Sequence, residues 1–198
     1  MDSQVLDGGF THPVMQSQTA FRAVMDALAN PGTIQALGLG LLPPKPLSPE
    51  LAAVALTLCD HDTPLWLDPS FANDDVLAWL RFHTGAPVTS ARAEAKFAFT
   101  REPAMVLADF DQGSDAYPDR STTIVLALPT LGGGSALHLA GPGIDGSSAI
   151  APQGLPADFL AQWAQNGAQF PRGVDLLLVA DGALIGLPRT TCISPKEA

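Results

Sequence analysis

The sequence is poor in positive charge. Its 198 residues include only ten Lys and Arg against twenty Asp and Glu, which gives a net charge of -10 at pH 7. A protein that binds the phosphate backbone of a nucleic acid needs a stripe of basic side chains. The composition therefore argues against nucleic acid as a partner.

Long apolar runs and a leader are also missing. No run approaches the roughly 20 apolar residues of a membrane span. The opening residues, MDSQVLDGGF, have neither the basic nor the apolar region of a secretory signal peptide. We therefore expect a cytoplasmic protein without membrane association.

Cysteine and lysine are scarce. Cys59 and Cys192 lie far apart in the sequence, which leaves open whether they meet in space, and we expect two free thiols. A Schiff-base enzyme needs a lysine held in a pocket. Lys45 lies between prolines and Lys196 lies in the tail, so Lys96 is the one candidate. This count argues against pyridoxal phosphate, and no cofactor is predicted.

Motifs for nucleophilic or metal chemistry are absent as well. There is no GxSxG elbow. The segment CDHD, residues 59–62, sets possible ligands side by side, but neighbouring side chains point in different directions and no second Cys/His cluster exists. We interpret it as a helix end that runs into a turn. His12, His83 and His138 stand singly, as surface or packing histidines do, so no metal site is predicted.

Two glycine-rich segments lack the context of a phosphate site. GPGIDG, residues 141–146, matches GxGxxG, but the extended segment SSAIAP follows it, whereas a dinucleotide site needs a helix there. LGGGS, residues 131–135, lacks the Lys-Ser/Thr ending of a P-loop. Both are predicted to be turns.

The sequence is rich in uncharged residues. Charged residues make up 15% of the chain, against roughly 25% in an average protein, and hydrophobic residues make up 46%. The length suits a single domain spanning residues 1–198. Part of its surface is therefore expected to be covered by other subunits.

A helix is predicted near the N-terminus. Four apolar residues recur at spacings of three and four, which places them on one face. They are Phe21, Val24, Met25 and Leu28. Ser17 is the expected N-cap, and Pro31 with Gly32 is expected to end the helix.

Helices and strands alternate along the rest of the chain. Further helices are predicted after Ser48, after Asn73 and within residues 156–167, and a short strand within 33–40. Strands are predicted at three β-rich runs, KFAFT, AMVLA and STTIVLALP, and a hairpin around Asp181 and Gly182. Continuous apolar strands are typical of sheets covered on both faces. The predicted fold class is α/β, a layered mixed β-sheet flanked by helices.

Two arginines are candidate binding residues. Arg22 lies on the first helix and Arg189 lies in LPRTT, after the predicted hairpin. A guanidinium can bind phosphate or carboxylate oxygens through two parallel hydrogen bonds. In a strongly acidic protein it can equally form an ordinary ion pair, and the sequence leaves both readings open.

A series of short motifs resembles one known family, the PhnH subunit of the bacterial carbon-phosphorus lyase system. The resemblance runs over nearly the whole chain and rests on the order of its pieces. They are Gly9-Phe10, Pro13-Val14, Ser17-Gln18, Phe21-Arg22, Met25, Pro31-Gly32, TPLWL, Tyr117-Pro118, GPGI and LPRTT.

The resemblance implies an accessory subunit in organophosphonate catabolism. In that family PhnH works with the G, I and L subunits to make alkylphosphonate ribose 5-triphosphate from ATP and a phosphonate. It also belongs to a core complex with G, I and J, and it is a homodimer when isolated. The family fold is similar to the large domain of pyridoxal-phosphate transferases without the cofactor site. No catalytic residue carries over to this sequence.

A second reading stays open at this point. The chain could be a self-sufficient small α/β transferase or hydrolase that acts on a phosphorylated or phosphonate small molecule. A pocket with several convergent titratable groups would favour that enzyme. Sparse charge and the missing motifs favour the subunit.

Overall fold

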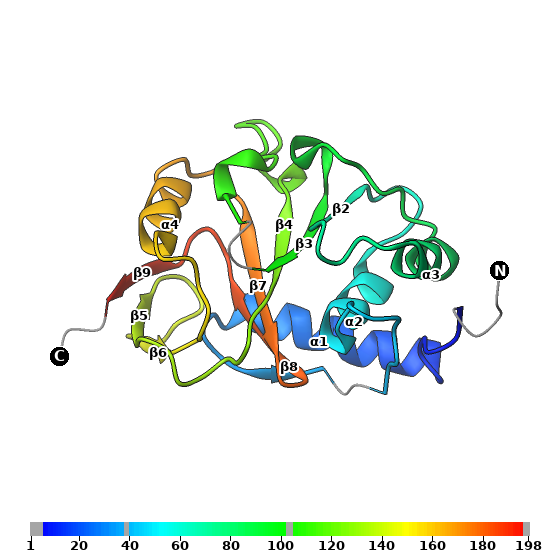
Figure 1. Ribbon diagram of the computed structural model, residues 1–198. Coiled ribbons are helices and arrows are strands. Elements are labelled where there is room, and N and C mark those ends of the chain that lie inside the picture. Colours follow the sequence, from blue (N-terminus) through cyan, green and yellow to red (C-terminus); the bar gives the residue numbers. More distant parts are fainter. Residues whose placement is uncertain (1–5, 38–39, 102–104, 196–198) are drawn as a thin grey trace.

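The fold is built on a six-stranded mixed sheet (Figure 1). The computed structural model describes residues 6–37, 40–101 and 105–195. Lys196 and part of the strand predicted at 33–40 fall outside these ranges. In the order of the sheet the strands are β1 (Gln35–Ala36), β8 (Ala183–Leu187), β7 (Asp175–Ala180), β4 (Thr123–Ala127), β3 (Phe97–Arg101) and β2 (Leu65–Leu67). Strands β2, β3, β4 and β7 are parallel, while β8 is antiparallel to both of its neighbours.

Helices and a smaller sheet cover the two faces. One face carries α1 (Pro13–Ala29), α2 (Pro49–Leu58) and α3 (Asp74–Thr84). The other carries α4 (Phe159–Gly167) and a three-stranded sheet of β6 (Ser148–Ile150), β5 (Leu137–Ala140) and β9 (Cys192–Pro195). Figure 1 shows these two groups on opposite sides of β7. The predicted α/β class with a layered mixed sheet is confirmed.

The described ranges also contain the 3-10 turns η2 (Arg92–Glu94), η3 (Leu107–Asp109) and η4 (Pro118–Arg120). The strand predicted at AMVLA is wrong for its described residues, because they lead into η3. None of the helices in the described ranges is long and apolar enough to cross a membrane.

The sheet separates two hydrophobic cores. Along β4 the side chains alternate, so that Val125 packs with the helices α1 to α3 while Ile124 and Leu126 pack with α4 and the small sheet. All three side chains are fully buried. Burial on both faces explains why the sequence of β4 is continuously apolar.

Most local signals in the sequence act as predicted. The side chains of Ser48 and Asn73 each accept a hydrogen bond from the backbone N–H three residues ahead, as N-caps do. Asp181 (φ 54°) and Gly182 (φ 73°) form the turn of the β7–β8 hairpin. Positive φ at both positions is what a tight hairpin turn requires.

The start of α1 differs from the prediction. The helix begins at Pro13, and His12 occupies the N-cap position. Ser17 lies inside the helix, where its hydroxyl donates to the Pro13 carbonyl oxygen at 2.6 Å, so its predicted capping role is wrong. Proline at the first helical position has no N–H to leave unsatisfied, which explains the earlier start. The predicted stop is confirmed, since α1 ends just before Pro31.

The buried face of α1 also differs. Small residues and Val24 face the sheet, whereas the side chains of Phe21 and Met25 are 47% and 48% exposed. The cause is the close approach of α1 to β8. A Cβ atom at Gly186 would lie 2.6 Å from the carbonyl carbon of Ala27. At this separation only small side chains fit beneath the helix, so the large ones point outward.

Candidate functional site

Two of the short motifs, LPRTT and Tyr117-Pro118, meet at the end of the sheet where β7 begins. Arg189 follows β8, and its guanidinium forms an ion pair with Asp175, the first residue of β7. It also donates to the carbonyl oxygen of Pro118, in η4, and to that of Pro171. Segments that lie up to 71 residues apart are thereby tied to one side chain.

Every N–H of the Arg189 guanidinium is used. Nε and Nη2 donate to the two carboxylate oxygens of Asp175, at 3.1 and 2.6 Å. Nη2 also donates to the Ser121 hydroxyl at 2.7 Å, and Nη1 makes the two carbonyl contacts at 2.9 and 3.3 Å. An arginine has five such donors. A phosphate or carboxylate ligand would therefore have to displace an existing acceptor, and a substrate contact by Arg189 stays a prediction.

A mostly apolar cleft of about 470 Å³ lies beside Arg189. Helix α4, the segment 189–193 and Pro142 line it, with the exposed Phe170 at its border. Trp163 of α4 donates from Nε1 to the Thr191 carbonyl oxygen at 2.7 Å, which fixes the two walls to each other. The Thr191 hydroxyl is buried and has no hydrogen-bond partner among the described residues.

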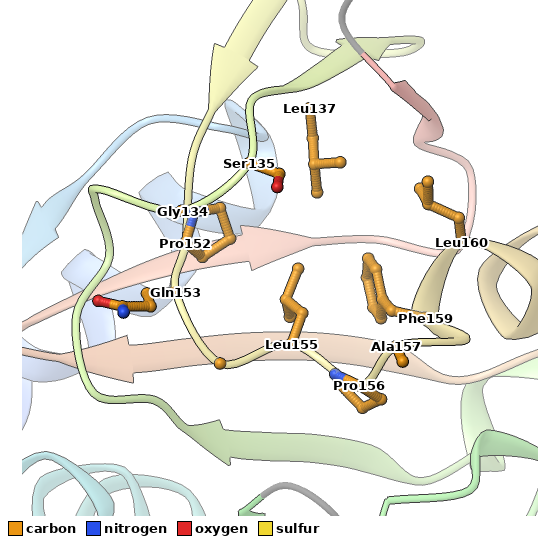
Figure 2. A pocket seen from close by; sticks show the side chains of 11 residues that line it. Gly134, Ser135, Leu137, Pro152, Gln153, Leu155, Pro156, Ala157, Phe159 and Leu160 are labelled. Atoms are coloured by element: carbon orange, nitrogen blue, oxygen red, sulfur yellow. The ribbon is translucent and has the colours of Figure 1, made fainter.

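A second cavity, of about 420 Å³, lies at the start of α4. Figure 2 shows Leu137, Leu155, Phe159 and Leu160 around it, with the polar side chains of Ser135 and Gln153 at the sides. Its lining contains no titratable side chain. The two cavities therefore flank α4, one near its start and one near its end.

Neither cavity is arranged for acid–base catalysis. In the cleft beside Arg189 the titratable side chains are Arg189, whose donors are engaged, and Cys192. General acid–base work needs a proton donor or acceptor within hydrogen-bond reach of a reacting group. The geometry of both cavities suits binding of an apolar or weakly polar group better than chemistry.

Arg22 and Lys96 stand apart from these cavities. Arg22 lies on the exposed side of α1, lines neither cavity and forms no ion pair with a described residue. The structure thus does not bring Arg22 and Arg189 into one site. Lys96 Nζ donates to Asp111 at 3.1 Å and to the Arg120 carbonyl oxygen at 2.6 Å. It is part of a surface ion pair rather than the occupant of a pocket.

Asp68, a buried carboxylate that directly follows β2, belongs to none of the motifs considered in the sequence. Burial by itself raises the pKa of this carboxyl. Hydrogen bonds from the Ser70 backbone N–H, the Ser70 and Thr100 hydroxyls and the Arg101 backbone outweigh it, so the pKa lies below its ordinary value. An acidic residue at the end of the buried run PLWL was the signal available in the sequence.

The CDHD segment and the cysteines match their interpretation. Cys59 is the C-cap of α2, and Asp60 Oδ1 accepts hydrogen bonds from the Asp62 backbone and the Thr63 hydroxyl to form the turn. Both cysteines are free, with Cys59 buried and Cys192 exposed. Burial, helped by the charge of Asp60, raises the pKa of the Cys59 thiol to about 12. No group of three or more metal-ligating side chains occurs in the ranges the structure describes.

Gly143 of the GPGIDG segment and Gly32 after α1 allow close packing between α1 and the small sheet. GPGIDG is the turn between the antiparallel strands β5 and β6, as predicted. A Cβ at Gly143 (φ +81°) would lie 2.2 Å from the Ala29 carbonyl oxygen, and one at Gly32 would lie 2.7 Å from the Leu139 side chain. The end of α1 therefore fits against the small sheet only because both positions lack a side chain.

Comparison with known proteins gives one family and two relatives. The family model described as "Bacterial phosphonate metabolism protein (PhnH)" matches residues 8–194. The "Alpha-D-ribose 1-methylphosphonate 5-triphosphate synthase subunit PhnH" of Rhizobium meliloti (strain 1021) is 50% identical over 192 residues, 96% of each chain. The "Putative C-P lyase subunit protein HtxG" of Stutzerimonas stutzeri is 32% identical over 186 residues, 92% of this chain and 88% of the relative.

Proposed function

Since the chain belongs to the PhnH family of bacterial phosphonate metabolism proteins, we propose that it is an accessory subunit of a carbon-phosphorus lyase complex. In this role it is required, together with partner subunits, for making alkylphosphonate ribose 5-triphosphate from ATP and a phosphonate. The observation that carries the proposal is the 50% identity to a synthase subunit over 96% of both chains.

The two cavities that flank α4 support an accessory role over a self-sufficient enzyme. A lone transferase or hydrolase would need a proton acceptor or a nucleophile near its substrate. The lining of the two cavities offers only Cys192 and the fully engaged Arg189. A subunit that orders a distant active site needs neither, because loss of a positioning contact alone can remove much of a rate.

The proposed partners are subunits of the G, I, J and L types, and a second copy of the chain when it is isolated. The low charged fraction supports contacts with other chains. We also propose that residues 1–198 form one domain, similar to the large domain of pyridoxal-phosphate transferases without a cofactor site. The four parallel strands with an antiparallel neighbour support this, as does Lys96, which is held by Asp111.

Within this function we propose different roles for the two arginines. Arg189 holds the segments around the start of β7 in place, since its five donors already have acceptors. Arg22 is exposed and free of ion pairs within the described chain, so it is available to a ligand or to another chain.

Reconstitution tests the proposed function. The purified chain is incubated with ATP and methylphosphonate, alone and with the partner subunits, and adenine release and the ³¹P NMR spectrum of the product are followed. We expect no turnover by the chain alone, turnover by the complete mixture, and none by the partners without the chain. Turnover by the chain alone, in a preparation shown by mass spectrometry to lack partners, would establish the self-sufficient enzyme instead.

A further inference from the structure

Two of the motifs on which the resemblance rests, GPGI and LPRTT, line the cleft beside Arg189. Pro142 comes from GPGI, and residues 189–191 come from LPRTT. Helix α4 lies next to β9, the strand that follows LPRTT, and forms the opposite wall (Figure 1). The cleft volume of about 470 Å³ is typical of a small-molecule site. The proposed function leaves this cleft without a ligand.

The cleft offers no free charge. Among its described lining residues Arg189 is the only Lys, Arg, Asp or Glu, and the five donors of its guanidinium already have acceptors. The rest of the lining is mostly apolar. A phosphate or carboxylate that entered would lose its hydration without gaining a partner of opposite charge. The cleft therefore suits an uncharged group.

Thr191 supplies a hydrogen-bonding group that is not in use. The residue lines the cleft and is only 3% exposed. In the part of the chain that the structure describes, its hydroxyl is the one buried side-chain polar atom without a hydrogen-bond partner. Such a hydroxyl destabilises a fold, because it has lost its hydration and gained no bond in return. A ligand that bonds to it would remove this penalty.

Phe170 adds an aromatic ring at the border of the cleft. Its side chain is 65% exposed, although burial of an aromatic ring is favourable. The flat ring of a ligand can stack on such a side chain, as nucleobases do on exposed aromatic residues. The cleft is thus suited to an uncharged, planar ring that carries polar atoms at its edge.

We infer that this ring is adenine. The inference rests on the proposed function, in which ATP provides the ribose and the three phosphates of the product. Adenine is the part of ATP that the product lacks, so it must leave. The triphosphate and the phosphonate are charged, and ribose is not planar. Adenine is the group in this reaction that is uncharged, planar and edged with nitrogen atoms that accept or donate hydrogen bonds.

Calorimetric titration of the isolated chain with adenine and with ATP tests the inference. We expect adenine to bind with a dissociation constant of about 100 μM, as suits a ligand of so few atoms. ATP should bind at least about tenfold more weakly, because its phosphates find no free cation in the cleft and the chain carries a net charge of -10.

Labelling of Cys192 shows where adenine binds. This thiol is exposed and lines the cleft. At about 1 mM adenine, roughly ten times the expected dissociation constant, most chains hold the base, so reaction of Cys192 with iodoacetamide should slow at least about fivefold.

Two variants and a matched control identify the contacts. Phe170→Ala should raise the dissociation constant of adenine about tenfold, because the stacking surface is lost. Phe82→Ala removes an equally exposed ring, 64% against 65%, from α3 on the other face of the sheet, and should leave adenine binding unchanged. Circular dichroism confirms that each variant is folded.

Thr191→Val tests the hydroxyl while keeping the shape of the side chain. It should raise the dissociation constant of adenine about fivefold. Its melting temperature should not fall, because the hydroxyl has no partner within the described chain. A hydroxyl with only a structural role would show the reverse, with a lower melting temperature and unchanged adenine binding.

Three outcomes overturn the inference: no binding of adenine at about 1 mM, binding that neither Phe170→Ala nor Thr191→Val weakens, or tighter binding of ATP than of adenine. If adenine does not bind and Phe170→Ala lowers incorporation into the reconstituted complex, the cleft is a contact for another subunit instead. Turnover of the complete mixture is measured separately, so the proposed function and the adenine site can each fail alone.

Discussion

Arg189 and Asp175 join the end of the β7–β8 hairpin to its beginning through a two-point contact between guanidinium and carboxylate. The distances are 3.1 and 2.6 Å, and the Arg189 side chain is only 12% exposed. Asp175 Oδ1 also accepts from the Arg189 backbone N–H at 2.8 Å. The pair fixes where the chain leaves β8 and enters the segment that lines the cleft.

Replacing Arg189 should cost stability. In Arg189→Ala, Asp175 loses its two side-chain donors and two backbone carbonyls lose theirs at a mostly buried site. We therefore expect the free energy of unfolding to fall by about 3 kcal/mol. Urea denaturation measures this. Arg172→Ala is the control, because Arg172 forms an exposed ion pair with Asp115 at 3.3 Å and should cost less than about 1 kcal/mol. If Arg189 only positions the fold, turnover per assembled complex stays unchanged, whereas a substrate contact would lower it with assembly intact.

Two glycines of the GPGIDG turn should differ in their tolerance of alanine. Both have positive φ, but a Cβ at Gly143 meets the Ala29 carbonyl oxygen at 2.2 Å while one at Gly146 meets nothing within 4 Å. Gly146→Ala should cost about 1 kcal/mol for the strained backbone alone. Gly143→Ala should cost at least about 3 kcal/mol, because the end of α1 must move as well. Equal thermal shifts for the two variants would contradict the close approach.

The buried Asp68 should make stability depend on pH. The pKa of the folded Asp68 carboxyl lies below its ordinary value of 3.8, so its ionised form stabilises the fold at neutral pH. This contribution is lost as the pH falls from the ordinary pKa of the carboxyl through its lower pKa in the folded state. Above about pH 5 we expect the free energy of unfolding of Asp68→Asn to be about 2 kcal/mol lower than that of the unaltered chain. Below about pH 4 this difference should shrink.

An exposed acid provides the comparison for that measurement. Asp119→Asn removes a carboxylate that lies at the surface in η4. It should change the unfolding free energy by less than about 0.5 kcal/mol. If the difference in unfolding free energy between Asp68→Asn and the unaltered chain stayed the same at acidic pH, the carboxylate charge would not be what stabilises the fold.

The two thiols should react very differently. The pKa of Cys59 is raised to about 12 by burial and by Asp60, so almost no thiolate is present at about pH 8. Cys192 is exposed. We expect a thiol reagent such as iodoacetamide to label one cysteine per native chain, and Cys192→Ser to leave none labelled until the protein unfolds. Mass spectrometry counts the labels, and rapid labelling of native Cys192→Ser would contradict the burial of Cys59.

Local signals in the sequence predicted much of the secondary structure. Ser48 and Asn73 cap their helices, and Asp181 with Gly182 forms the hairpin turn, because each depends on residues within a few positions. Ser17 failed as a cap because the same hydroxyl can also bond backward to the carbonyl oxygen of Pro13 inside a helix. A sequence pattern does not separate these two uses.

The parts that could not be predicted depend on distant contacts. The apolar spacing in α1 predicts a helix, which is confirmed, but whether Phe21 faces the sheet depends on Gly186, more than 150 residues away. Likewise the motif LPRTT makes Arg189 a candidate binding residue, whereas several of its acceptors lie in distant segments, at Ser121, Pro118 and Pro171. Neither the contact between α1 and Gly186 nor the set of Arg189 acceptors follows a periodic pattern or a short spacing that could be recognised in a single sequence.

The sheet that separates the two hydrophobic cores also shapes how the sequence can change. Side chains of one core contact each other, whereas the strand backbones stand between them and the other core. Substitutions that lie more than about 7–10 Å apart without shared partners are close to additive in free energy. The residues of one core can therefore be replaced, with compensating changes of side-chain volume, while the residues of the other core stay the same. A lineage could thus remodel the α4 wall of the cleft, around Trp163, without altering the helix that carries Phe21.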